Sequence, residues 1–127
     1  MGIVYSSIKL KNAIVNSATI EMEGKVDSGA TMLVLPKSVA DDLNLPFHRK
    51  ITVKYANEET AERDVVYGVE LEICGRKAIF EAIVEPKKKY PLIGAIVMET
   101  LDLIIEPRDL KIYPNPRSPL MPMAEIE

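Results

Sequence analysis

Residues 26–31 read Val26-Asp27-Ser28-Gly29-Ala30-Thr31 and lead directly into the apolar run Met-Leu-Val-Leu-Pro at 32–36. Asp-Ser-Gly alone is a common turn sequence, because aspartate accepts hydrogen bonds from nearby backbone N–H groups and glycine readily adopts positive φ. In this chain, however, apolar segments lie on both sides of the turn. That context favours a functional aspartate over a plain turn residue.

Three features of the stretch suit a catalytic carboxylate. Val26 belongs to an apolar strand that would carry Asp27 into a buried position, and Ser28 supplies a hydroxyl that could brace the loop. Gly29 lets the backbone turn tightly beside a substrate. The apolar run at 32–36 and the short helix expected after it would anchor the loop from behind. We therefore interpret Asp27 as the candidate catalytic residue, and a turn aspartate is the alternative.

The rare residues disfavour other chemistries. The only cysteine, Cys74, excludes an internal disulfide and a cysteine-based zinc site. The only histidine, His48, lies in a charged stretch, so a histidine-pair metal site is absent and a Ser-His-Asp triad is disfavoured. We expect no metal and no cofactor, and any catalysis would use carboxylates.

The composition predicts a single soluble domain. The chain has 127 residues, of which 47% are hydrophobic and 28% charged, with a net charge of −3. This balance indicates binding neither to nucleic acid nor to an anionic membrane surface. No segment approaches the roughly 18 apolar residues of a membrane span, and no signal-peptide core is evident. We expect a cytoplasmic location.

The hydrophobic patterns predict a mostly β protein with two short helices. One helix would begin near Pro36, with Val39, Ala40 and Leu43 on one face, and the second would cover 95–101. Turn signals at Asn57–Glu59, Gly75-Arg76 and Pro107–Asp109 predict three hairpins. Strands are expected over 3–10, 18–26, 32–36, 51–56, 60–67, 69–74, 77–84, 103–106 and 110–113.

A second motif, Leu92-Ile93-Gly94-Ala95, lies directly before the second predicted helix. Taken alone, it is most simply a strand-to-helix junction. A glycine at this place also suits a close approach between two backbones.

With both motifs considered, the chain resembles the retropepsins, the dimeric aspartic peptidases that include the retroviral proteases and prokaryotic relatives. The resemblance runs from about Ala18 to about Leu101, and its most specific parts are VDSGAT at 26–31, LEICGRKAIF at 71–80 and PLIGA at 91–95. It implies a closed β-barrel with a flap hairpin and one or two short helices, formed by residues 1–113 and making up one half of a dimeric peptidase. Residues 114–127 contain four prolines and are expected to be an extended or disordered tail.

The resemblance also implies roles for individual residues. Asp27 would be the catalytic aspartate, Ser28 the hydroxyl of a brace between subunits, and Gly29 and Ala30 the support of the loop. The hairpin at 53–64 would be the flap over a peptide or protein substrate. Its tip would be Ala56, Asn57, Glu58, Glu59 and Thr60, and the wall beneath the catalytic loop would be Leu92, Ile93 and Gly94. Because the chain has a single Asp-Ser-Gly, a homodimer would be needed to supply two carboxylates.

Two positions and the flap tip depart from the retroviral pattern. Thr31 and Ala95 stand where retroviral members have an aspartate and an arginine that pair, so both partners are missing together. The expected flap tip has no glycine and is acidic. These departures favour an alternative, a catalytically silent dimer of the same fold that binds peptides or assists assembly. A small β-barrel without any site is a remoter third possibility.

Overall fold

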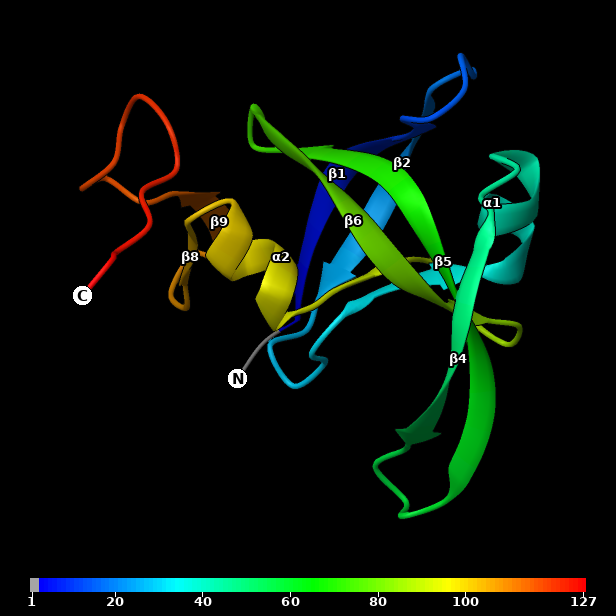
Figure 1. The fold of residues 1–127 in the computed structure, drawn as a ribbon. Helices are drawn as coiled ribbons and strands as arrows, with labels where there is room; N and C mark the ends of the chain where they lie inside the picture. Colours follow the sequence, from blue (N-terminus) through cyan, green and yellow to red (C-terminus); the bar gives the residue numbers. More distant parts are fainter. Residues whose placement is uncertain (1–2) are drawn as a thin grey trace.

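The computed structural model describes residues 3–127, so residues 1 and 2 of the predicted domain lie outside the described part. The chain is mostly β with two short helices, as predicted (Figure 1). In chain order the elements are β1 (Val4–Asn12), β2 (Ile20–Val26), β3 (Leu33–Pro36), α1 (Lys37–Asp42), β4 (Phe47–Lys54), β5 (Thr60–Ile73), β6 (Arg76–Glu85), β7 (Leu92–Ile93), α2 (Ala95–Thr100), β8 (Leu103–Glu106) and β9 (Lys111–Pro114).

The main sheet closes into a barrel. Its strand order is β1-β2-β7-β3-β6-β5-β4, and β1 also pairs with β5, through 9–12 against 69–72. The β1–β5 pairing closes the sheet, and β4 extends beyond this closed ring by pairing with β5. The interior is filled by aliphatic side chains that are almost completely buried, among them Ile8, Leu10, Leu35, Leu71 and Ile93. This packing confirms the prediction of a closed β-barrel.

The β4–β5 hairpin projects beyond the barrel, where Figure 1 shows it below the other strands. β4 begins at Phe47, four residues before the predicted start of this strand at 51. The early residues of β4 are exposed, so their strand conformation comes from pairing with β5 and not from burial. The side-chain contact between Lys50 and Asp64 at 2.9 Å adds to this pairing.

The prediction of separate strands at 60–67 and 69–74 was wrong, because β5 is continuous from Thr60 to Ile73. Its register against β6 shifts between Val66 and Val69, and Gly68 there has φ +80°. Gly68 therefore marks a β-bulge within one strand and not a turn between two.

The last hairpin, β8–β9, forms a separate two-stranded sheet, in agreement with the predicted pairing across 107–109. After it, Ser118 is buried, and its hydroxyl donates a hydrogen bond to the Asp102 carboxylate at 2.5 Å while its carbonyl accepts one from Arg76. Residues 119–127 are exposed and contain no helix or strand. The division into a domain at 1–113 and a tail at 114–127 stays a prediction.

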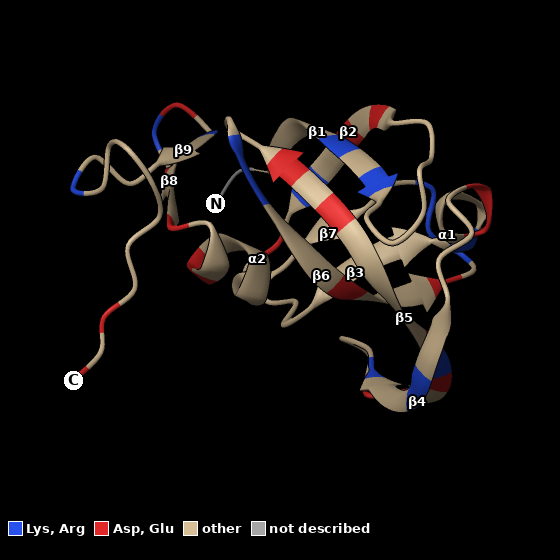
Figure 2. Cartoon of the chain, turned by 45° about the horizontal axis from the view of Figure 1, so that its top comes forward, with Lys and Arg blue, Asp and Glu red and all other residues tan. Residues whose placement is uncertain are grey.

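Charged residues of both signs are interspersed over the described chain, as Figure 2 shows. β6, for example, begins with Arg76 and Lys77 and ends with Glu85. Among residues 3–127, neither helix is long and apolar enough to cross a membrane.

Candidate active site

Asp27 follows β2 directly, at the point where that strand leaves the barrel. The preceding Val26 is buried and pairs with Ile93 of β7, and the Asp27 backbone N–H donates to the Ile93 carbonyl at 3.0 Å. The Asp27 side chain is half-buried. The barrel therefore fixes the backbone of this residue while its carboxylate reaches the surface.

The loop after Asp27 is a tight turn closed by the aspartate itself. The Gly29 N–H donates to Asp27 Oδ1 at 3.0 Å, and the Ala30 N–H donates to the Asp27 carbonyl at 3.1 Å. The turn geometry considered as an alternative for Asp27 is therefore present. This turn uses Asp27 Oδ1 as a hydrogen-bond acceptor, which is compatible with chemistry at the carboxylate. Ser28 is exposed, so its hydroxyl is accessible to a second chain.

Gly94 lies directly against the Asp27 loop. A Cβ at this position would lie 2.5 Å from the Met32 carbonyl oxygen and 2.7 Å from that of Ala30, so the close approach leaves no room for a side chain. The next two N–H groups, of Ala95 and Ile96, donate to the carbonyls of Ala30 and Thr31 at 2.8 and 2.9 Å. The start of α2 thus holds the loop through backbone hydrogen bonds.

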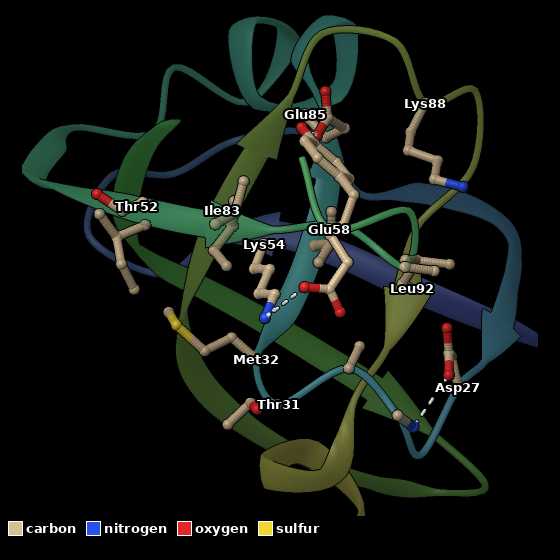
Figure 3. A pocket seen from close by; sticks show the side chains of 17 residues that line it. Asp27, Thr31, Met32, Thr52, Lys54, Glu58, Ile83, Glu85, Lys88 and Leu92 are labelled. Atoms are coloured by element: carbon tan, nitrogen blue, oxygen red, sulfur yellow. Dashed lines mark hydrogen bonds and ion pairs between the residues drawn. The ribbon is translucent and has the colours of Figure 1, made fainter. Parts of the chain in front are cut away.

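Asp27 lines a cavity of about 930 Å³ that extends from its loop to the β4–β5 hairpin (Figure 3). One part of the lining is apolar and comes from the Asp27 loop, β3, β4, β6 and β7. These residues include Met32, Val34, Ile51, Val53, Ile83 and Leu92. The cavity also has a charged part, formed by Lys54, Glu58, Glu85 and Lys88. Such a cleft can hold an extended peptide beside a carboxylate.

The predicted flap tip is only partly in the cavity lining. Ala56 and Glu58 line it, whereas Asn57, Glu59 and Thr60 do not. Glu58 has φ +71° and pairs with Lys54 at 3.3 Å. The tip therefore makes its turn without the glycine whose absence was noted in the sequence.

The comparisons with known proteins agree with this geometry. A sequence model described as aspartyl protease matches residues 12–96, which include the Asp27 loop, the hairpin and the Gly94 segment. The chain belongs to the aspartyl protease family. No curated protein matches this family member significantly in sequence.

A solved structure shows the same fold. The solution structure of simian foamy virus (mac) protease superposes with a TM-score of 0.54 at 21% sequence identity. The match covers 74% of this chain and 90% of the viral protease. The predicted retropepsin-like aspartic peptidase fold is confirmed.

Sequence reasoning missed the polar residues of this aspartyl protease that lie at the hairpin end of the cavity. Glu85 is 6% exposed, and it accepts hydrogen bonds from Tyr55 and Arg63 of the hairpin. The hydrogen bond to Glu85 is the main cause that raises the pKa of the Tyr55 hydroxyl above its usual value. The available signal was an acidic residue at the end of the mostly apolar stretch 78–84, which also contains Glu81, but the partners of Glu85 depend on the fold.

Proposed function

We propose that the chain is a homodimeric aspartic endopeptidase, in which two Asp27 carboxylates, one from each subunit, face each other across a two-fold axis. The observation that carries the proposal is the position of Asp27. It lies on a loop fixed by the barrel and by α2, and it opens into a cavity large enough for a peptide. The single Asp-Ser-Gly per chain supports the need for a second subunit.

Two close carboxylates cannot both ionise easily, so the pair would share one proton. The ionised member takes a proton from a bound water, and the water oxygen attacks the scissile carbonyl carbon. The protonated member donates its proton to the developing oxyanion and a proton later reaches the leaving amine. In each loop, the Gly29 N–H would keep the Asp27 side chain oriented through Oδ1.

A second function is a silent peptide-binding dimer. The two departures at Thr31 and Ala95 and the hairpin tip closed by the Lys54–Glu58 pair favour it, because these are the places where the chain differs from the retroviral pattern. This dimer would use the same cavity without turnover.

Binding of a statine-type transition-state mimic tests the choice between the two functions. An active pair should bind the mimic more tightly where one carboxyl is protonated than where both are ionised. The Asp27→Asn variant should lose both this pH dependence and the cleavage of unstructured peptides. Mimic binding that is independent of pH in the parent protein, with no cleavage, would favour the silent dimer.

A further inference from the structure

The strongest polar feature outside the catalytic loop is the burial of Glu85 at the end of β6. Its side chain is 8% exposed, and its backbone pairs with Pro36 in the parallel β3–β6 ladder. A buried carboxylate is costly unless it is charge-paired and hydrogen-bonded. The identity of its partners therefore indicates what this carboxylate holds in place.

Two of these partners belong to the β4–β5 hairpin. The Tyr55 hydroxyl donates to Glu85 Oε2 at 2.5 Å, and the Arg63 Nε–H donates to Oε1 at 3.3 Å. The Lys87 backbone N–H, just after β6, also donates to Oε1, at 3.5 Å. The Arg63 guanidinium lies 6.0 Å from the centre of the Tyr55 ring. Glu85 thus joins the residue that follows β4, Tyr55, and a residue of β5, Arg63, to the end of β6.

Tyr55 is well placed to transmit this restraint to the hairpin tip. Its N–H donates to the Glu59 carbonyl at 2.8 Å, and its carbonyl accepts from the Glu58 N–H at 3.0 Å, so Tyr55 closes the turn. Tyr55 and Glu85 also line the cavity that contains Asp27, as Figure 3 shows for Glu85 and Asp27. Fixing the Tyr55 side chain therefore fixes the tip relative to the cleft.

A second ion pair on β6 provides an ordinary surface contact for comparison with the Glu85 contacts. Glu81 pairs with Arg49 of β4 at 2.6 Å, but the Glu81 side chain is 38% exposed and lies outside the Asp27 cavity. Surface pairs of this kind contribute little. The Glu85 contacts differ in their burial, in the tyrosine, and in their place at the cavity.

We propose that Glu85 is a positioning residue, which holds the β4–β5 hairpin over the cleft in the position that binds peptide. The inference rests on the proposed function. Without the Glu85 contacts, a smaller fraction of the molecules has the hairpin in the binding position. The apparent affinity for substrate falls in proportion to this fraction. The chemistry at Asp27 is separate from these contacts. Loss of the contacts should therefore raise KM more than it lowers kcat.

Peptide-cleavage kinetics of Tyr55→Phe, Glu85→Gln and the double variant test the proposal, with Glu81→Gln as the matched control. We expect KM to rise about tenfold in each single variant while kcat changes by less than about threefold. KM of the double variant should rise no more than KM of the more affected single variant, because both changes break the same contact. Glu81→Gln should behave as the parent. An unchanged KM, or a fall in kcat alone, would overturn the proposal.

Hydrogen exchange of the backbone amides at 55–60 separates this inference from the proposed function, because it needs no turnover. Exchange there should be about tenfold faster in Tyr55→Phe and Glu85→Gln than in the parent and in Glu81→Gln. Equal exchange in all four proteins overturns the role of Glu85, whatever their activity. Faster exchange in these two variants, together with a parent protein that cleaves no peptide, supports hairpin positioning and counts against the endopeptidase.

Discussion

At the scale of single residues, Asp27 combines two roles that sequence patterns treat as alternatives. Its Oδ1 atom orders the loop by accepting the Gly29 N–H, as a turn aspartate does, and its half-buried carboxylate still opens into the cavity. The neighbouring residues hold the Asp27 loop against the barrel and α2. Val26 is buried in the barrel wall, and the Ala30 carbonyl accepts a hydrogen bond from α2.

Gly94 gives the sharpest test at this scale. In Gly94→Ala the new Cβ would meet backbone carbonyl oxygens of Met32 and Ala30, so α2 or the Asp27 loop must move. We expect a loss of about 1–3 kcal/mol in the free energy of unfolding, by analogy with overpacked cores. Peptide cleavage should fall further than this loss of stability explains, because the displaced loop carries Asp27.

Gly75→Ala is the control for this prediction. Gly75 has φ +75° in the β5–β6 turn, and a Cβ there has no neighbour within 4 Å. The variant should lose about 1–2 kcal/mol through left-handed backbone strain alone and keep full activity. Chemical denaturation and cleavage rates measure both quantities. Equal activity in Gly94→Ala and Gly75→Ala would show that the close approach does not matter to the site.

At the scale of elements, the hairpins show what the sequence could and could not predict. The β8–β9 pairing and the β5–β6 turn at Gly75 follow from local turn residues flanked by alternating strands. The continuity of β5 through Gly68 does not, because a bulge and a turn share the same local signal. Likewise, VDSGAT at 26–31 identified Asp27, whereas the contact of Glu85 with Tyr55 joins residues 30 positions apart.

The hairpin contact predicts a pH dependence of stability. Burial raises the pKa of the Glu85 carboxyl, but hydrogen bonds from Tyr55 and the Lys87 backbone and the charge of Arg63 outweigh it, so the pKa lies below its ordinary value of 4.5. A lowered folded-state pKa gives stability that is present above the ordinary value and is lost as pH falls through the lowered one. Glu85→Gln should lack this component.

Thermal melts of the parent and Glu85→Gln from neutral pH to below pH 4.5 measure the difference. Four other charged residues line the same cavity as Glu85, namely Asp27, Lys54, Glu58 and Lys88, and both proteins retain them. The Tm difference between the two proteins should therefore narrow as the pH is lowered. A constant difference at every pH would contradict the lowered pKa of Glu85.

The segment after β9 is attached to the barrel through Asp102. Its carboxylate accepts hydrogen bonds from the Ser118 hydroxyl, the Asn115 side-chain amide and the Met123 backbone N–H, and these hold its pKa below the usual range. Asp102→Ala should release residues 115–123, so limited proteolysis should cut there faster while the barrel stays protected. Equal cutting rates in Asp102→Ala and the parent would show that these contacts do not order the segment.

At the scale of the whole molecule, one chain supplies a closed barrel, a projecting hairpin and a single Asp27 carboxylate that lines a cavity. Length, apolar patterning and two motifs were sufficient to predict this architecture and the family. The charged end of the cavity could not be predicted, because it depends on how β4, β5 and β6 meet. The proposed dimer would place the exposed Ser28 hydroxyl near a second loop.

Mixing active and inactive subunits tests most directly whether two Asp27 residues form one site. Parent protein and Asp27→Asn should be combined in equal amounts, allowed to exchange subunits, and assayed for peptide cleavage at fixed total concentration. If each site needs both carboxylates, only parent–parent dimers are active, and random pairing leaves about a quarter of the activity of the pure parent at that concentration. Activity of about one half, in proportion to the parent subunits present, would contradict the shared site.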